Sequence, residues 1–402
     1  MDVYKRLFTG LAVSFTGCIG VAQNPVEETL RSMNQNASIE KALHHMDDVL
    51  VENQASIDSS WLLSAAVLVC IALAGLCLFE TGIVRSRHSI NVGLKSMLNF
   101  SVALVVYIFL GSSLMYAIGS ADWSTIRLED FQIWQFSAND AVWAFLLFQA
   151  ACAAFCSAIA SGAMAERVRF SGYLIFVALF AGIIYPAFGH WAWGSRGTLY
   201  GLGGEAGWLE AMGFHDFAGA TVIFGVGGAT ALAGIMIVGS RINRFRKDGK
   251  PLLIANHNIP LAIIGVVILS VGWFGIIGGA HVNTNAAPGR LFVNTAMAGA
   301  GGCISGLLLF GIIRGAPGVF VVVNGLIGGL VAVSAGCDVI NPLSATVIGA
   351  VAGIFASSGA VLIEKLKLDD ATGAIPVYLC NGVWGTIAVA LFHENGFQID
   401  VL

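Results

Sequence analysis

Charged residues are scarce in this sequence. Only 11% of its 402 residues are Asp, Glu, Lys or Arg, and 57% are apolar, whereas soluble domains carry about 25% charged residues. This composition excludes an ordinary soluble protein and predicts an integral membrane protein surrounded by lipid. The 50 glycines agree, because small residues let helices approach closely in lipid. A basic stripe is also missing, so no nucleic-acid partner is expected.

The patterns of catalytic and metal sites are missing as well. The eight cysteines lie mostly in apolar segments and lack the spacing of metal ligands, so neither a metal nor another cofactor is expected. No nucleophile–base set or phosphate-binding loop is recognisable, which argues against an enzyme. The GxxxG spacing of Gly325 and Gly329 indicates helix packing.

The N-terminus predicts a signal peptide over residues 1–22. Lys5 and Arg6 precede a short apolar core, and a small-x-small exit ends at Ala22. Residues 23–57 are polar, with a helix expected over 38–52, and they would lie outside the cytoplasm.

Apolar runs of about 17–25 residues come next, the length that a membrane-spanning helix needs. They predict an all-α membrane fold with ten transmembrane helices. These helices are expected over residues 61–83, 95–118, 141–164, 170–193, 217–239, 259–279, 291–313, 317–336, 343–363 and 375–392.

Lys and Arg set the predicted orientation. They concentrate in alternate loops, and the other loops hold only Arg127, Arg196 and Arg290. Because cytoplasmic loops carry the excess of positive charge, the mature N-terminus and the last residues are expected outside. The prediction is a multi-pass protein of the plasma (inner) membrane.

Two nine-residue segments share one pattern. DFAGATVIF over 216–224 and DATGAIPVY over 370–378 both read acid, two residues, glycine, four residues, aromatic. The acids are Asp216 and Asp370, the glycines Gly219 and Gly373, and the rings Phe224 and Tyr378.

The pair indicates an inverted repeat. The first segment opens the fifth predicted helix from outside, and the second opens the tenth from inside. The halves would be residues 61–239 and 259–392, with a substrate site at their interface near the membrane midplane. At 1.5 Å per residue each ring lies about 12 Å below its acid, so the two rings could meet there.

Motifs in collinear order from about residue 58 to 398 resemble the ammonium transporter (Amt/Mep/Rh) family. They are LFETG over 78–82, AMAERVRF over 163–170, HWAWG over 190–194, DFAG over 216–219, GWFG over 272–275, FVNT over 292–295 and DDATGAI over 369–375. The resemblance implies a transporter-like domain over 58–402, with ammonium or ammonia as its ligand and membrane lipid around it. It also implies a homotrimer with one pore per subunit, and an eleventh helix expected just beyond residue 400.

The resemblance assigns an outer vestibule to four residues. Trp193 matches the tryptophan that holds ammonium by a cation–π contact, and its alternative is an interfacial tryptophan. Phe148 matches the outer of two stacked pore phenylalanines, with lipid-facing or core packing as the alternative. Asp216 supports the site from below or caps a helix. Ala280 stands where a hydroxyl group often contacts ammonium.

The pore centre departs from the family. Phe224 and Tyr378 stand where the family carries two histidines, one in each half. Neutral imidazoles each offer a donor and an acceptor for passing ammonia and a proton, whereas Phe224 offers neither. Cys152 stands where the inner pore phenylalanine is expected, and Ile276 where another aromatic is common.

Single polar residues in the spans have structural interpretations as well. Glu80, in the first span, would be costly in lipid and hints at function; its alternative is a structural hydrogen-bonding group. Glu166 and Arg167 are expected to form an ion pair at the cytoplasmic interface.

Two functions stay open. In the first, the protein recruits ammonium at the outer vestibule and handles ammonium or ammonia across the membrane through a modified pore. In the second, it is a non-conducting ammonium sensor coupled to a cytoplasmic signalling module, a use that suits the altered pore.

Overall fold

The computed structural model describes residues 25–117, 140–200, 202–282, 286–314 and 318–397. The predicted signal peptide lies outside these residues. The chain divides into two compact units, Met1–Ala55 and Ser56–Leu402, and the second unit carries all of the predicted membrane spans. Within the described ranges the chain is almost entirely helical, with one isolated bridge between Phe245 and Pro251.

Nine helices of the described chain are long and apolar enough to cross a membrane. The shorter apolar helix α11 falls within the remaining predicted span, 317–336. The predicted all-α membrane fold is therefore confirmed. The α-helices are α2 (Pro25–Ile83), α3 (Ser86–Val106), α4 (Asp140–Ala163), α5 (Phe170–Leu179), α6 (Tyr185–Trp193), α7 (Trp208–Ala211), α8 (Val226–Val238), α9 (Ile259–His281), α10 (Pro288–Arg314), α11 (Val319–Val333), α12 (Pro342–Lys365) and α13 (Cys380–Phe392).

Several spans continue through tighter or wider turns. The π-helical segments are η2 (Tyr107–Gly111), η3 (Ser113–Ala117), η7 (Phe180–Ile184), η9 (Ala220–Gly225) and η10 (Ile375–Leu379), and η8 (Gly194–Tyr200) is a 3₁₀-helix. π-turns inside helices occur frequently at functional sites. Two of them, η9 and η10, open the helices that carry the paired motif.

The first helix begins much earlier than its apolar run. It starts at Pro25 and absorbs the helix predicted over 38–52. Proline suits the first turn of a helix, and residues 26–57 contain neither Gly nor Pro that would interrupt it. Hydropathy therefore located the membrane portion and not the helix start.

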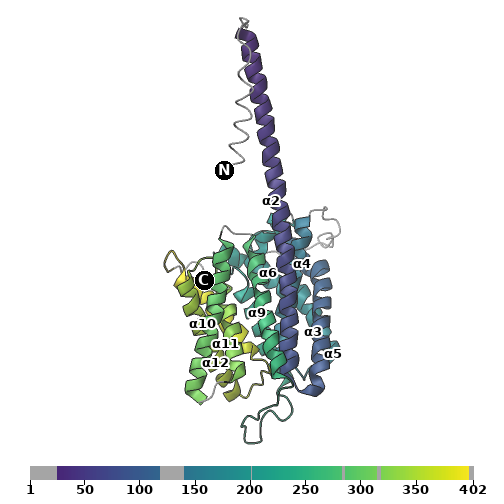
Figure 1. Ribbon diagram of the computed structural model, residues 1–402. Helices are drawn as coiled ribbons and strands as arrows, with labels where there is room; N and C mark the ends of the chain where they lie inside the picture. The colour runs from purple at the N-terminus through teal and green to yellow at the C-terminus, as the bar shows by residue number, and fades with distance from the viewer. Residues whose placement is uncertain (1–24, 118–139, 201, 283–285, 315–317, 398–402) are drawn as a thin grey trace. The chain divides into compact units, whose positions relative to one another are not determined.

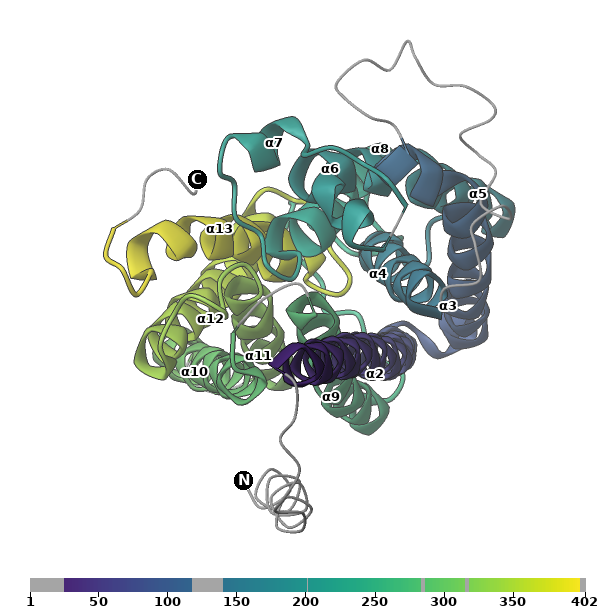
Figure 2. The same ribbon diagram turned by 90° about the horizontal axis from the view of Figure 1, so that it is seen from above.

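The helices of the second unit run side by side (Figure 1). Seen from above, α10, α11 and α12 lie together, and α3 lies beside α4 and α5 (Figure 2). A Cβ atom added at Gly325 or Gly329 of α11 would clash with a backbone carbonyl oxygen of α10. The packing role predicted for this GxxxG pair is confirmed.

Helices α8 and α13, which follow the two segments of the paired motif, run antiparallel. The hydroxyl groups of Thr221 and Thr386 form a hydrogen bond, and Gly228 packs on the Leu379 backbone. Beyond the end of α8, Arg241 bonds Asp369, which precedes η10. The two acids of the motif thus lie at opposite ends of the helix pair, as an inverted repeat requires.

Candidate functional site

Each acid of the paired motif caps the π-helix that follows it. Asp216 accepts backbone N–H bonds from Gly219, Thr221 and Val222 at 2.9–3.0 Å. Burial raises the pKa of this carboxyl group, and the backbone N–H groups partly counter the rise. The predicted helix cap at Asp216 is confirmed, because its carboxylate accepts hydrogen bonds from the backbone N–H groups at the helix start.

The second acid repeats this geometry. Asp370 accepts N–H bonds from Gly373, Ala374 and Ile375 at 2.8–3.0 Å. Gly219 and Gly373 sit at the same step of the two caps, with φ of 91° and 79°. This left-handed conformation favours glycine, which explains why both motifs carry one. Two segments 154 residues apart therefore share one local structure.

Three of the four predicted vestibule residues line one small cavity. Phe148, Trp193 and Ala280 are among its lining residues, and its volume is about 10 Å³. Trp193 is only 3% exposed, which excludes the alternative of an interfacial tryptophan. Its indole N–H donates to the Asp216 carbonyl oxygen at 2.7 Å. Asp216 thus joins the site through its backbone.

Arg196, which the sequence alone shows only as a loop charge, also lines this cavity. Its guanidinium carbon lies 4.5 Å from the centre of the Trp193 ring. The same group donates to the carbonyl oxygens of Asp216 at 3.3 Å and Phe217 at 3.2 Å. Arg196 therefore occupies the cation–π position on Trp193 with a cation of the protein itself. Its only signal in the sequence was its place three residues after Trp193, because residues i and i+3 are neighbours on a helix surface.

The two rings of the paired motif meet, as predicted. Phe224 and Tyr378 lie with ring centres 6.2 Å apart and planes 24° apart. Trp273 stacks on Phe224 at 4.5 Å and 16°. Phe155 packs edge-on against both Phe224 and Trp273. The centre of the predicted pore is thus filled by an aromatic stack.

Trp273 and Phe155 were missed as pore-centre residues. Trp273 belongs to the GWFG motif, but nothing in that motif relates it to Phe224. Cys152, predicted at the pore centre, lines the vestibule cavity. One turn further along α4, the Cys156 thiol donates to the Ile223 carbonyl oxygen at 2.8 Å.

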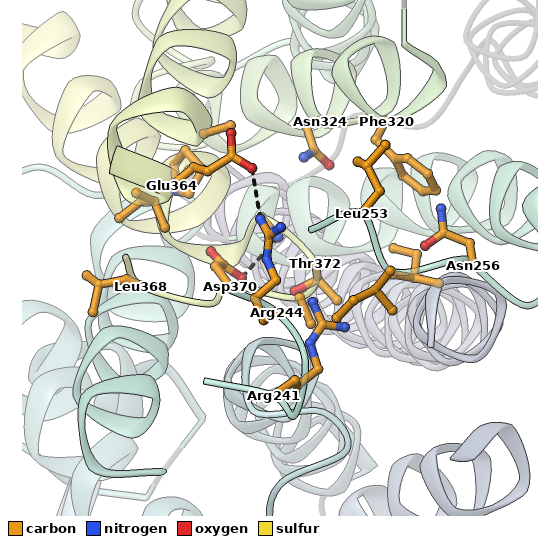
Figure 3. Close-up of a pocket in the computed structure, with 17 residues that line it drawn as sticks. Arg241, Arg244, Leu253, Asn256, Phe320, Asn324, Glu364, Leu368, Asp370 and Thr372 are labelled. Atoms are coloured by element: carbon orange, nitrogen blue, oxygen red, sulfur yellow. Dashed lines mark hydrogen bonds and ion pairs between the residues drawn. The ribbon is translucent and has the colours of Figure 1, made fainter. Parts of the chain in front are cut away.

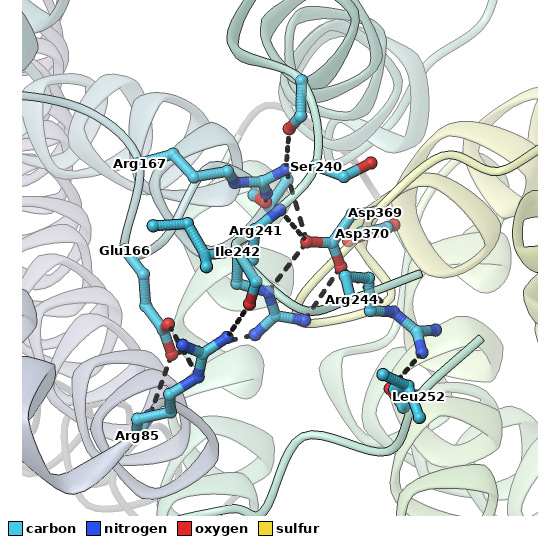
Figure 4. A network of polar contacts seen from close by, with 12 residues as sticks. Arg85, Glu166, Arg167, Ser240, Arg241, Ile242, Arg244, Leu252, Asp369 and Asp370 are labelled. Carbon is cyan, nitrogen blue, oxygen red and sulfur yellow. Dashed lines mark hydrogen bonds and ion pairs between the residues drawn. The ribbon is translucent and has the colours of Figure 1, made fainter. Parts of the chain in front are cut away.

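A network of arginines and acids lies at the other end of the helices, near Asp370 (Figure 4). Asp369 accepts from Arg241 Nε and Nη2, both at 2.9 Å, and lies 3.7 Å from Arg167 Nη1. Burial raises the pKa of Asp369, but the hydrogen bonds and charge of Arg241 and the charge of Arg167 outweigh it. The resulting pKa is below the usual value.

The predicted ion pair between Glu166 and Arg167 is wrong. Glu166 pairs with Arg85 at 3.3 Å and Arg241 at 3.8 Å, while Arg167 reaches Asp369. Adjacent residues rarely face each other, and the positive φ of Glu166, 69°, turns the chain between them.

A larger pocket of about 270 Å³ lies beside this network (Figure 3). Arg241, Arg244, Asp370, Thr372 and Asn324 contribute polar groups to it. The Arg244 guanidinium donates to Glu364 at 3.0 Å across the pocket wall.

The whole membrane unit matches one family. The sequence profile of the Ammonium Transporter Family covers residues 60–400. The chain therefore belongs to the ammonium transporter family, which is a family of transporters and not of enzymes. It is a multi-pass membrane protein with the fold of that family.

Individual members of the family are similar to this chain in sequence. A protein of Synechocystis sp. named as a putative ammonium transporter is 38% identical over 343 residues, which are 84% of this chain and 62% of the relative. Ammonium transporter Amt2 of Archaeoglobus fulgidus is 36% identical over 88% of this chain and 75% of its own length. The chain thus spans under two thirds of the first relative and three quarters of the second.

Solved structures share the fold. The structure named Sensor Amt Protein matches with a TM-score of 0.80 and 33% identity, covering 87% of this chain and 88% of that one. Candida albicans Mep2 matches with a TM-score of 0.74 at 24% identity, over 85% of this chain and 76% of that one.

Proposed function

We propose that this protein binds ammonium at an outer vestibule and handles ammonium or ammonia across the plasma membrane through a modified pore. The observation that carries the proposal is the cavity formed by Phe148, Trp193 and Ala280 directly above the capped start of η9. An indole face at the mouth of a membrane pore attracts a small cation. Family membership supplies the choice of ammonium.

Binding at Trp193 requires Arg196 to move. The indole face holds one cation at a time, and the guanidinium lies over it. Ammonium therefore competes with a tethered cation, which lowers its apparent affinity until Arg196 swings away. The competition gives the vestibule two states. In one, Arg196 lies on the Trp193 ring, and in the other, ammonium does.

The second candidate function is a non-conducting ammonium sensor with a cytoplasmic signalling partner. The stacked rings of Phe224, Trp273 and Tyr378 favour it, because they fill the pore centre. The similarity to the Sensor Amt Protein supports it too. A ligand biases such a switch only through its different affinity for the two states, and displacement of Arg196 supplies such a difference.

The remaining parts of the proposal concern assembly and orientation. We expect a homotrimer with the mature N-terminus outside. Arg85, Arg167, Arg241 and Arg244 gather at one end of the bundle, and an excess of positive charge of this kind supports a cytoplasmic face there.

Ammonium-elicited charge movement in proteoliposomes decides between the two functions, with a conducting family member as the control. A sustained, concentration-dependent current supports transport through a pore that needs no histidine pair. If the protein forms trimers and binds ammonium but carries no current, the result contradicts transport and supports sensing. Loss of ammonium binding altogether would contradict both.

A further inference from the structure

A further pocket, of about 430 Å³, lies among the arginines at the end of the bundle shown in Figure 4. This volume is within the range of ~300–1,000 Å³ that is typical of small-molecule sites. The link from α2 to α3, the link from α4 to α5 and the segment after α8 all contribute to its lining. It shares only Arg241 with the 270 Å³ pocket and no residue with the vestibule cavity.

Positive charge exceeds negative charge around this pocket. Its lining contains four arginines and one carboxylate, Glu166. Glu166 pairs with Arg85 and Arg241. Asp369, which does not line the pocket, pairs with Arg167 and Arg241. The four arginines are Arg85, Arg87, Arg167 and Arg241. Two carboxylates thus offset four guanidinium groups, so the pocket attracts anions.

Arg87 has no acidic partner. Its side chain is exposed and forms no ion pair with a described residue. Its Nε donates to His88 Nε2 at 3.0 Å, and none of its other N–H groups has a partner among the described residues. The terminal N–H groups of this guanidinium are therefore free to bind a ligand at the pocket.

Arg167 is short of acceptors as well. Its side chain is only 6% exposed, and its one ion-pair distance, to Asp369, is 3.7 Å. The two terminal nitrogens donate to the carbonyl oxygens of Gly239 and Ala163, while Nε has no partner among the described residues. A buried cation that is compensated in this partial way adds to the positive potential of the pocket.

The start of α3 also favours an anion here. Arg85 is its cap residue, and Arg87 and His88 lie in its first turn, which contains no acidic residue. Negative groups are the ones that a helix start stabilises. Glu166 reaches in from another loop and accepts the Arg85 backbone N–H at 2.9 Å. One carboxylate oxygen therefore already occupies this helix start, and the pocket beside it is lined by basic groups.

Apolar side chains adjoin these basic ones. Ile242 lines the pocket, and Ile90 and Ile237 are each close in sequence to a lining residue. All three are exposed. At the end of a membrane-spanning bundle, such a surface is accessible to lipid as well as to water.

We propose that this pocket binds a phosphate group, held by Arg85, Arg87 and the start of α3, with the charge of Arg167 behind them. Guanidinium groups match phosphate oxygens with paired hydrogen bonds, and helix starts bind phosphate through the backbone. The phosphate belongs to an anionic lipid headgroup or to a soluble phosphate compound, which present the same chemistry to the arginines. The inference goes beyond the handling of ammonium and does not depend on it.

Thermal unfolding of the purified full chain in detergent tests the site. Sodium phosphate and dioctanoyl phosphatidylglycerol are the two probes, and low ionic strength keeps the attraction unscreened. A ligand that binds the folded protein raises Tm with its concentration, so at least one probe should raise it. Sodium acetate and dioctanoyl phosphatidylcholine, whose phosphate is neutralised by choline, should raise it less.

The two probes distinguish the sources of the phosphate. A rise with phosphatidylglycerol alone supports the site and identifies a lipid headgroup as its ligand. A rise with sodium phosphate supports the site and shows that soluble phosphate enters it.

Two pairs of variants test the residues. Arg87→Gln should weaken the apparent affinity by about tenfold or more, since hydrogen bonds to a charged group are lost. Arg169→Gln is the matched control, because Arg169 is an exposed arginine at the cap of α5 and lies outside the lining. Ser240→Asp adds a carboxylate to the lining and should weaken binding, whereas Ser240→Asn should not. Arg87 and Ser240 are both exposed, so these variants should unfold at the wild-type Tm without ligand.

Several results would overturn the site. One is a Tm that neither probe raises, and another is a rise of the same size with acetate or phosphatidylcholine. Binding that survives both Arg87→Gln and Ser240→Asp also contradicts it. An equal loss with Arg169→Gln and Arg87→Gln would show a diffuse attraction to the basic end of the bundle and not a phosphate site.

Discussion

Arg196 shows how one side chain changes the chemistry of a familiar site. Its guanidinium group covers the indole that would otherwise be open to a ligand cation. Two backbone carbonyl groups hold it there. The proposed ammonium site is therefore already covered by a cation of the protein.

We predict that Arg196→Ala tightens ammonium binding by about 2–30-fold. The reason is that a cation–π contact contributes ~0.5–2 kcal/mol, and the variant returns this contact to the ligand. Calorimetric titration measures the change. Arg290→Ala is the matched control, because it removes an arginine of the predicted outer side that pairs with Glu394 at the surface. Equal or weaker affinity after Arg196→Ala would contradict the competition.

At this scale the sequence predicted part of the site. The family resemblance assigned Trp193, Phe148 and Ala280 to one vestibule, and the three line one cavity. Arg196 and Trp273 were not assigned, because their roles arise from contacts with residues distant in the chain or on the next helical segment. Cys152 lines the same cavity as Phe148, and its role at the pore centre stays a prediction.

At the scale of elements, Asp369 joins three segments. It binds Arg241 after α8 and lies near Arg167 after α4, while its own segment leads into η10. Breaking a buried ion pair by removing one partner leaves an uncompensated charge. One carboxylate of the second half therefore holds the arginine-rich end of the first half.

Asp369→Asn should destabilise the folded protein by ~3–5 kcal/mol. Thermal unfolding in detergent measures the loss. Glu364→Gln is the control, since that carboxylate is partly exposed and its ion pair is with Arg244, which is partly exposed too. It should cost about 1 kcal/mol or less. Equal losses for the two variants would argue against a network centred on Asp369.

The same carboxylate predicts a pH dependence. The folded-state pKa of Asp369 lies below its ordinary value of 3.8, so its stabilising contribution is present above pH 3.8. It is lost as the pH falls through the folded-state pKa. The difference in Tm between the wild type and Asp369→Asn should therefore be constant above pH 3.8 and shrink below it. A difference that grows on acidification would contradict this sign.

One of the two caps was predictable from the sequence. An Asp at the start of a helix implied the cap at Asp216, and this cap formed. The cap at Asp370 was not predicted by itself, but it has the same geometry. The π-turns after them were not predictable, because hydrophobic periodicity does not distinguish one wide turn from an α-helical one.

On the scale of the whole molecule, hydropathy predicted the all-α membrane fold and the positions of its spans. The orientation that Lys and Arg indicate stays a prediction. A nine-residue pattern found twice predicted the inverted repeat. The length of α2 was not predicted, because polarity ends a membrane span without ending a helix. The filled pore also needed the structure, since only contacts between the halves bring Phe224, Tyr378 and Trp273 together.

Restoring histidine at both positions should open the pore. We expect Phe224→His combined with Tyr378→His to raise ammonium-dependent current in proteoliposomes above that of the wild type, because facing imidazoles can pass ammonia and protons. Each single variant should give less current than the pair. A double variant that assembles and binds ammonium but stays at the wild-type level would show that the block lies elsewhere, with Trp273 the first residue to change.

The two caps have a consequence for how such a protein can evolve. Asp216 and Asp370 hold the backbone through main-chain N–H groups, so the course of each helix is fixed before the identity of residue 224 or 378 matters. A lineage can exchange those two side chains without redesigning the scaffold. The two proposed functions therefore require no different scaffold, only different side chains at positions 224 and 378.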